Sequence, residues 1–513
     1  MPQTRLLFIV VVAAVLQVCA LAADARPNIV VVMVDDMGFS DLGCYGGEIA
    51  TPNIDRLAGS GMRFTRFYNN AKCEPSRASL LTGKYSQQVG ASATVTYRSP
   101  TMGEVLRPAG YRTLMVGKWH AGQKPFDRGF DRHYGLTDGC CNYFNPGVQR
   151  DGEPKPSEKN FPRRWAEDDK DYKPYTPADP KFYATDAFTT YAINYLDQYK
   201  AEDKPFLLYV AYNAPHYPLH AWPEDIAKYK GKYMKGWDAL RQERFERQVK
   251  SGLLAPGTKL SPRDAGVLEW ESLTQTQKEE WDLRMAVYAA MVDRIDQNIG
   301  RLLKKIDELG KTENTLVLFL SDNGGEFDDT DYSNVKSTPP GPLESYRMVG
   351  KPWANANNTP FRKYKTFHHE GGIATPLIAC WPKLIKAGVI SEQPGHLIDL
   401  LPTFIEMAGA DYPKTWAGKA LDAPAGRSLL PVFKGEARPT QPIFWNFGAA
   451  AAVQNGDWKL VRAGKQERDW ELYNLSNDRT ELNNLAAQQP EKVKELSALW
   501  NDWRKRVNDE EAK

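Results

Sequence analysis

The sequence has little cysteine, little histidine and almost no net charge. Its 513 residues contain six cysteines and seven histidines, and 66 Lys and Arg against 64 Asp and Glu leave a formal charge of +2. So few cysteines exclude a dense disulfide framework. The balanced charge is unlike that of polybasic nucleic-acid binders or acidic tails, so we expect no nucleic-acid partner.

Beyond its first residues the chain also lacks any long hydrophobic run. Arg5 precedes an apolar stretch that ends among small residues such as Ala22 and Ala25. This order is typical of a secretory signal peptide, which we predict over residues 1–25, with an uncleaved anchor or lipidation at Cys19 as alternatives. No other stretch reaches the roughly 20 apolar residues that a membrane span needs. We therefore expect a secreted or periplasmic protein without a stable span in its mature chain.

Short apolar runs alternate with helical patterns through most of the chain. This alternation predicts an α/β fold in residues 26–435, with a large, mostly parallel sheet sandwiched by helices. The predicted strands are Ile29–Val34, Thr113–Val116, Phe206–Ala211, Thr315–Leu320 and Leu377–Ala379. Two longer segments, 142–181 and 235–276, are interpreted as a surface excursion and a helical insertion, which could shape a substrate entrance or be solvated decoration.

The pattern changes near Gly435. Residues 436–513 predict a smaller antiparallel sheet with a C-terminal helix that begins at Pro490. The strands expected there are Ile443–Trp445, Trp458–Val461 and Trp470–Tyr473.

Acids, bases and amides follow four of the five strands predicted for the large sheet. They are Asp35 and Asp36, Lys118 and His120, Asn213 and His216, and Asp322 and Asn323. Because ligands bind beyond the carboxyl ends of parallel strands, these side chains predict one site built from distant parts of the chain. The Asp and Asn residues are hard oxygen ligands, which suit Ca²⁺ or Mg²⁺ better than zinc. Asp35 and Asp36 taken alone are also compatible with a turn or a helix cap.

The segment Cys73-Glu-Pro-Ser-Arg77 predicts a helix N-terminus at Cys73, since Pro75 suits a first helical turn. Free backbone N–H groups there favour an anion, and Arg77 can reach the same anion with a forked donor. Loss of the signal peptide leaves five cysteines, so one thiol stays unpaired, and Cys73 is the best candidate. A purely structural cysteine is the alternative for this segment by itself.

The segment CEPSRASLLTG resembles the signature of type I sulfatases of the alkaline phosphatase superfamily. The resemblance spans nearly the whole mature chain, in order, through VVMVDDMG, GKWHAG, NAPHYP, SDNGG, HHEGGIATPLI and GDWKLV. The segments KGWDALRQER and NTPFRKYKTFHHEGG are most similar to bacterial arylsulfatases. The resemblance implies hydrolysis of sulfate esters through a formylglycine that a maturation enzyme makes from Cys73.

The resemblance also implies roles for the remaining site residues. One Ca²⁺, or Mg²⁺ in its place, would be bound by Asp35, Asp36, Asp322, Asn323 and the residue derived from Cys73. Arg77 would hold that modified residue, and His120 would act as a base. Sulfate oxygens or the leaving group would be bound by Lys118, His216 and Lys365, the last matched by its distance before Glu370.

Two features depart from the family pattern. Glu74 stands where a small residue is usual, which could impair maturation, and WNFGAAAAV at 445–453 lacks polar residues that many relatives carry. Two other readings stay open: a phosphomonoester or phosphonate hydrolase of the same superfamily, and a catalytically inactive binding homologue. The substrate would be a sulfated small molecule, such as an aryl sulfate, or a sulfated glycan, since specificity lies in loops.

Overall fold

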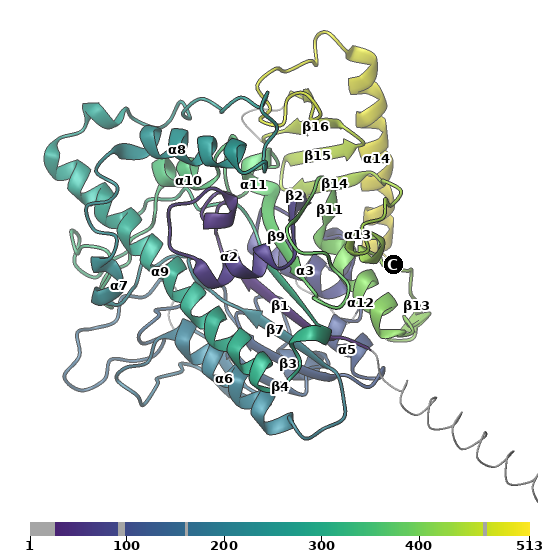
Figure 1. The fold of residues 1–513 in the computed structure, drawn as a ribbon, viewed down its shortest axis with the longest axis horizontal. Coiled ribbons are helices and arrows are strands. Elements are labelled where there is room, and N and C mark those ends of the chain that lie inside the picture. The colour runs from purple at the N-terminus through teal and green to yellow at the C-terminus, as the bar shows by residue number, and fades with distance from the viewer. Residues whose placement is uncertain (1–25, 91–97, 160–162, 465–468, 513) are drawn as a thin grey trace, which may run out of the picture.

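The structure is a computed structural model that describes residues 26–90, 98–159, 163–464 and 469–512. The predicted signal peptide lies outside the described residues. A large sheet runs through the molecule with helices on both faces, and a smaller sheet with a long helix lies at one end (Figure 1). Within the described ranges, no helix combines the length and apolar character needed to cross a membrane.

The large sheet has eleven strands, and their order is β10-β2-β9-β8-β1-β7-β3-β4-β5-β6, with β11 paired to β2. The strands are β1 (Asn28–Val34), β2 (Met62–Tyr68), β3 (Arg112–Gly117), β4 (Arg132–Leu136), β5 (Trp165–Glu167), β6 (Lys170–Tyr172), β7 (Phe206–Ala211), β8 (Thr315–Ser321), β9 (Ala374–Cys380), β10 (Val389–Ser391) and β11 (Gly395–His396). All five predicted strands are confirmed, within a residue or a few at each end. Strands β8, β1, β7, β3 and β4 run parallel, whereas β9 is antiparallel to both β8 and β2.

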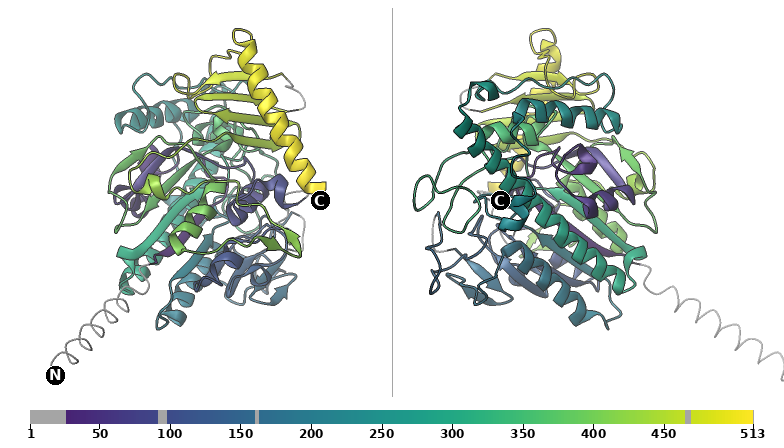
Figure 2. Two further views of the ribbon diagram at one scale, coloured as in Figure 1. Left: turned by 90° about the vertical axis from the view of Figure 1, so that its right-hand side faces the viewer. Right: turned by 60° about the vertical axis from the view of Figure 1, so that its left-hand side comes forward.

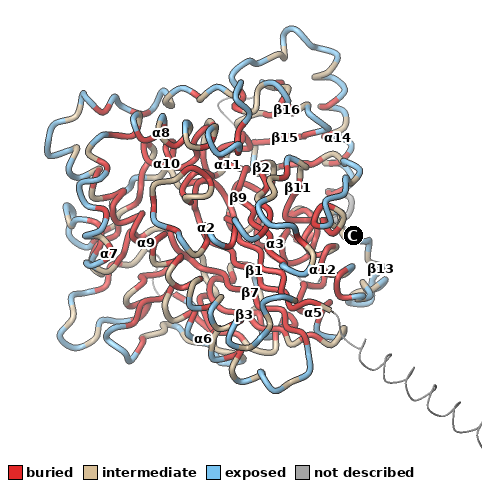
Figure 3. The backbone as a smooth tube through the Cα atoms, viewed as in Figure 1, coloured by how far each residue is buried: buried red, intermediate tan, exposed pale blue. Residues whose placement is uncertain are grey.

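Strand β1 shows why the sheet is covered on both faces. Its residues are buried throughout, and successive side chains point to opposite sides. Val30, Val32 and Val34 belong to one hydrophobic cluster, while Ile29, Val31 and Met33 belong to another. In Figure 3 the central strands accordingly form the buried middle of the molecule.

Helices divide between these two clusters. The first cluster includes buried residues of α2 (Pro52–Gly59), α6 (Ala184–Tyr199), α8 (Gly236–Lys250), α9 (Gln275–Glu308) and α10 (Lys351–Asn357), with α7 (Pro223–Ala227) beside α9. The second includes residues of α3 (Cys73–Thr82), α4 (Ser86–Val89), α5 (Met102–Leu106), α12 (Leu400–Ala408) and α13 (Leu430–Phe433). Short α11 (Glu370–Ile373) leads directly into β9. The predicted α/β sandwich is therefore confirmed.

The C-terminal unit is an antiparallel sheet in the order β14-β15-β16-β17, with α14 packed along it. These elements are β14 (Ile443–Phe447), β15 (Ala450–Asn455), β16 (Trp458–Arg462), β17 (Glu471–Asn474) and α14 (Pro490–Ala512). Figure 2 shows α14 lying diagonally across the small sheet. Its Leu496, Trp500 and Trp503 share a cluster with Tyr85 and Ile398 of the preceding fold, so the unit is anchored to the large domain.

Candidate active site

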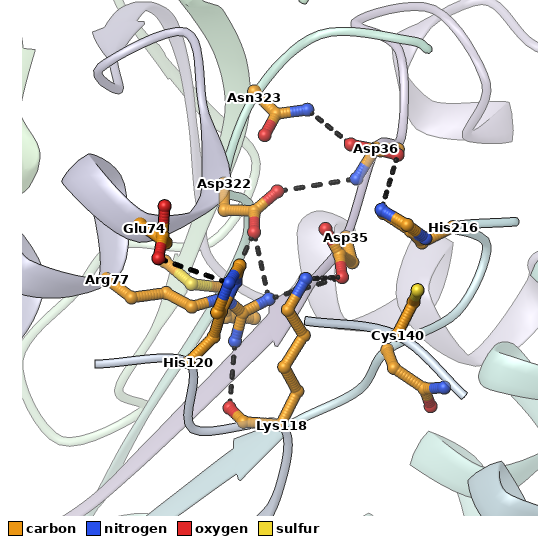
Figure 4. A network of polar contacts seen from close by, with 12 residues as sticks. Asp35, Asp36, Glu74, Arg77, Lys118, His120, Cys140, His216, Asp322 and Asn323 are labelled. Carbon is orange, nitrogen blue, oxygen red and sulfur yellow. Dashed lines mark hydrogen bonds and ion pairs between the residues drawn. The ribbon is translucent and has the colours of Figure 1, made fainter. Parts of the chain in front are cut away.

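The polar residues predicted at the strand ends do meet at one edge of the large sheet (Figure 4). Asp35 and Asp36 follow β1, and Asp322 follows the neighbouring strand β8. Lys118 directly follows β3, and His216 lies in the loop after β7. All five side chains are buried. Parallel pairing brings the carboxyl ends of these strands together, which is why residues almost 300 positions apart become neighbours.

The predicted nucleophile is the first residue of α3, as expected. Cys73 is 4% exposed, and Lys72 before it has extended backbone dihedrals. Asn70 steadies this turn, because its backbone N–H donates to Ser76 Oγ at 3.0 Å and its side chain donates to Ser79 Oγ at 2.7 Å. Cys73 therefore stands at a helix N-terminus, where partial positive charge favours an anion.

Arg77 lies one turn further along α3 and joins two strand ends. Its side chain is fully buried, and Nη2 donates to Asp322 Oδ2 at 2.8 Å. Nη1 donates to the backbone carbonyl of Lys118 at 3.0 Å, and Nη2 lies 3.7 Å from Asp35 Oδ2. Because a buried guanidinium must be paired, these contacts fix the position of α3 against β1, β3 and β8.

Lys118 and Lys365 are also buried, and each contacts one of the two adjacent aspartates, Asp35 and Asp36. Lys118 Nζ lies 2.5 Å from Asp35 Oδ2, and Lys365 Nζ lies 2.8 Å from Asp36 Oδ1. Lys365 also contacts Glu326 Oε2 at 2.9 Å. Three carboxylates (Asp35, Asp36, Asp322) thus face three cations (Arg77, Lys118, Lys365) at this edge of the sheet.

The three carboxyl groups have different proton affinities. Burial and the charge of Asp35 raise the pKa of Asp322 to about 7, and burial also raises the pKa of Asp36. Burial alone would raise the pKa of Asp35, but Lys118 and other neighbouring cations together lower it. Asp322 and Asp36 are therefore the two carboxyls that a divalent cation would stabilise most in their charged form.

The donor set fits a hard divalent cation. Among the described residues, Asp35 Oδ1 and Asn323 Oδ1 have no hydrogen-bond partner, although both atoms are buried. Asn323 Nδ2 donates to Asp36 Oδ1 at 2.6 Å, which ties the amide to the same cluster. Oxygen atoms from two carboxylates and an amide are typical ligands of Ca²⁺ and Mg²⁺. Asp35, Asp36 and His216 also place one ligand atom each within 4.8 Å of one another.

Two histidines flank the site. His216 Nε2 lies 3.5 Å from Asp36 Oδ2, and its Nδ1 is 2.8 Å from the carbonyl of Tyr217. His120 has a positive φ of 48°, and its Nε2 lies 3.3 Å from Glu74 Oε1. Burial lowers the pKa of His216 to about 3 and, with the charges of Lys118 and Arg77, holds the pKa of His120 well below its usual value. Burial therefore favours the neutral form of both rings.

A pocket of about 710 Å³ opens above these residues. Its walls include Cys73, Glu74, His120, His216 and Lys365, so the predicted nucleophile and both histidines face one cavity. The rest of the lining is mostly charged or aromatic: Lys72, Tyr217, Glu326, Phe327, Asp328, Asp329 and Lys351, with Gly139, Cys140 and Thr366. The volume lies within the range of small-molecule and cofactor sites.

Sequence reasoning missed several residues of this pocket, among them Glu326 and Cys140. Glu326, which holds Lys365, directly follows the SDNGG segment, so its position beside the strand-end motif was an available signal. The Sγ atom of Cys140 accepts a hydrogen bond from Arg163 Nη2 at 3.0 Å. No pattern could have paired them, because Arg163 lies in the irregular segment before β5. Residues 445–453 do not line the pocket, although the Phe447 ring lies 4.5 Å from Lys72 Nζ.

The segment that carries Lys365 is held by side chains of the C-terminal unit, here called the C-terminal clamp (Lys459, Glu471, Tyr473 and Glu481). At the start of the segment, Arg362 Nη1 donates to Tyr473 Oη at 3.0 Å. At its end, His369 Nε2 lies 3.2 Å from Glu471 Oε2, and Lys459 contacts Glu370. The C-terminal unit therefore fixes both sides of the loop that presents Lys365 to the pocket.

Comparisons with known proteins agree with this geometry. The sulfatase family model matches residues 27–410, and a model for the C-terminal part of N-sulphoglucosamine sulphohydrolase matches 361–509. An uncharacterized sulfatase of Schizosaccharomyces pombe is 34% identical over 93% of both chains, and the arylsulfatase of Klebsiella aerogenes is 32% identical over 80% of this chain and 92% of its own. The crystal structure of Ps i-CgsB with k-i-k-neocarrahexaose is 27% identical, with a TM-score of 0.68 over 93% and 92% of the two chains.

The family model covers well over half of the chain, and its range contains every residue predicted for the site, from Asp35 to Lys365. The Schizosaccharomyces pombe and Klebsiella aerogenes sulfatases are both more than 30% identical to this chain, and each match covers more than 90% of the relative's own length. The chain therefore belongs to the sulfatase family and is a hydrolase of sulfate esters.

Proposed function

We propose that this sulfatase is exported, that Cys73 is converted to formylglycine by a maturation enzyme, and that one Ca²⁺ binds beside it. Asp35, Asp36, Asp322 and Asn323, with the residue derived from Cys73, would hold the ion, and Mg²⁺ is the alternative. The observation that carries the proposal is the convergence of Cys73, at a helix N-terminus, with unpartnered buried oxygens of Asp35 and Asn323. The segment predicted as a signal peptide supports export.

The modified residue would supply an oxygen nucleophile, and the metal would polarise it and the sulfate group. The remaining residues bind and orient the substrate. Lys365 and His216 line the pocket and are placed to contact sulfate oxygens, and Arg77 holds the N-terminus of α3 against Asp322. Lys118 is fully buried against Asp35, so its contact with a sulfate oxygen is part of the proposal. His120, neutral near pH 7, is placed to take a proton within the same pocket.

The charge balance of the site explains why it would select an anion. The three cations Arg77, Lys118 and Lys365 face four carboxylates, those of Asp35, Asp36, Asp322 and Glu326, so one carboxylate is in excess. A bound divalent cation would give this edge of the sheet a net positive charge. In a pocket with buried walls such a charge is weakly screened, so it favours a sulfate group and charge that develops on its oxygens.

For the substrate we propose a sulfated carbohydrate, with aryl sulfates accepted as small surrogates. The mouth of the pocket is rich in groups that hydrogen-bond to hydroxyls, such as Glu74, Asp328, Asp329 and Thr366. The relative solved with a neocarrahexaose supports a sugar, whereas the Klebsiella arylsulfatase supports the surrogate. A sulfated small molecule of another kind is the alternative.

The test uses protein made in a host that matures sulfatases. Mass spectrometry of the tryptic peptide Cys73–Arg77 should show the thiol converted to an aldehyde. The protein should hydrolyse p-nitrophenyl sulfate far faster than p-nitrophenyl phosphate, and Cys73→Ala should abolish both activities. A preference for phosphate would favour the phosphoester alternative, and an intact thiol in an inactive protein would favour a binding homologue. A panel of sulfated mono- and oligosaccharides then tests the substrate class.

A further inference from the structure

Glu74, the residue after the nucleophile, turns its carboxylate toward a histidine of the site. It is the second residue of α3, and Oε1 lies 3.3 Å from His120 Nε2 (Figure 4). Its side chain is 37% exposed and lines the pocket. A carboxylate in a first helical turn gains from the helix dipole wherever it points, so the dipole alone does not explain this direction.

Gly139 packs closely against the imidazole of His120. A Cβ at Gly139 would lie 2.8 Å from Cε1 of the ring, so only glycine leaves room for the ring in this place. Nδ1 is buried and has no hydrogen-bond partner among the described residues. The carboxylate of Glu74 is thus the acidic group that contacts this ring, and it contacts the Nε2 side alone.

We propose that Glu74 is a positioning residue for His120. It holds the ring through the contact between its carboxylate and Nε2, and this contact favours the tautomer that carries the ring proton on Nε2. When His120 takes a proton during turnover, the carboxylate at 3.3 Å offsets the positive charge of the imidazolium. This inference rests on the proposed role of His120 as a base. It gives a purpose to the acidic residue that departs from the family pattern at this position.

The kinetic test separates this role from an effect on maturation. For Glu74→Ala, Glu74→Gln and Glu74→Asp, the matured fraction is measured on the peptide 73–77, and kcat is expressed per matured molecule. We expect Glu74→Ala to lower kcat roughly 10-fold while KM changes less than about twofold, a part of the roughly 100-fold or more that acid–base catalysis contributes. Glu74→Gln should behave like Ala because it lacks the charge, and Glu74→Asp should restore part of kcat.

A double-mutant cycle identifies the partner. In a His120→Ala background, Glu74→Ala should cause no further loss, because its effect passes through the imidazole. The control is Glu491→Gln, which removes an exposed carboxylate from the first turn of α14 and should leave kcat unchanged. Equal normalised kcat for wild type and Glu74→Ala would overturn the proposal, and so would additive losses in the cycle. Equal kcat would leave only the matured fraction dependent on Glu74, and additive losses would mean that Glu74 acts on kcat without His120.

A second readout needs no activity. In protein with ¹⁵N-labelled histidine rings, the His120 signals, assigned by comparison with His120→Ala, should report a proton on Nε2. Glu74→Ala should shift the ring toward a mixture of tautomers. An unchanged tautomer in Glu74→Ala would contradict the positioning role even in a protein that hydrolyses no sulfate ester. Failure of the proposed function and failure of this inference are therefore distinguishable.

Discussion

Lys459 is the residue whose loss should reveal how the C-terminal clamp supports the site. Its Nζ, on β16, lies 2.8 Å from Glu370 Oε1 and 2.7 Å from Glu481 Oε1, and all three side chains are 0% exposed. Lys459→Met keeps the volume but leaves two buried carboxylates without this cation. Removing one partner from a buried ion pair costs about 3–5 kcal/mol. We expect Lys459→Met to lower the free energy of unfolding by roughly 3 kcal/mol, the lower end of this range, because Arg479 still pairs with Glu370 at 2.9 Å.

The free energy of unfolding of wild type and Lys459→Met is compared in urea at pH 7, with intrinsic tryptophan fluorescence as the signal. The matched control is Lys304→Met, since the Lys304 side chain is 78% exposed and lies 3.9 Å from Glu308. The free energy of unfolding of Lys304→Met should equal that of wild type within error. The reasoning would be refuted if Lys459→Met lost less than about 1 kcal/mol, the cost of an exposed pair.

A functional consequence follows from the same contacts. Glu370 ends the segment that begins at Arg362 and carries Lys365, so an unpaired Glu370 should loosen that segment. In the absence of urea, and at a temperature where Lys459→Met is folded, kcat/KM for p-nitrophenyl sulfate should fall several-fold. Full activity in a destabilised protein would show that the clamp supports the fold but not the position of Lys365.

Three further outcomes are expected. Chelation of divalent cations should lower activity and melting temperature, Ca²⁺ should restore both, and Asp36→Asn should make the melting temperature insensitive to Ca²⁺. Gly139→Ala should lower kcat without changing the free energy of unfolding, because its Cβ would lie 2.8 Å from the His120 ring. The control Gly59→Ala, whose Cβ would have no atom within 4 Å, should change neither quantity. Burial lowers the pKa of His133 from 6.5 to about 3. Between these pH values the unfolded chain binds a proton at His133 and the folded chain does not, so the free energy of unfolding falls as pH drops below 6.5. In urea titrations between pH 6 and 4, the free energy of unfolding of His133→Gln should fall less steeply with decreasing pH than that of wild type, by up to about 1.4 kcal/mol per pH unit.

The parallel strands and the site edge were predictable because their signals are local. Each predicted strand is a short, wholly apolar run, and the acids and bases that follow Val34, Val116 and Leu320 mark where it ends. Their convergence needed only the rule that parallel strands end on one side. The position of Cys73 at a helix start followed in the same way from Pro75 and the helix-forming residues after it.

Other elements gave weak or misleading patterns. Strand β15 was missed because its Ala450–Val453 stretch is rich in alanine, which has low strand propensity, and it forms only between β14 and β16. The segment interpreted as a surface excursion contains β5, which pairs with β4, and β6, which pairs with β5, and the pairing of β5 with β4 depends on tertiary contacts. The domain boundary near residue 435 stays a prediction.

The contacts of Lys365 suggest how the site tolerates so many buried charges. Lys365 Nζ contacts both Asp36 and Glu326, and Glu326 is itself held by two backbone N–H groups, those of Phe327 and Asp328. If a divalent cation takes the oxygens of Asp36, Lys365 keeps Glu326 as a partner and is not left as an isolated buried charge. A neutral residue at position 326 would lack this second partner. Binding of the cation would then compete with the pairing of Lys365, so Glu326→Gln should weaken the Ca²⁺-dependent rise in melting temperature.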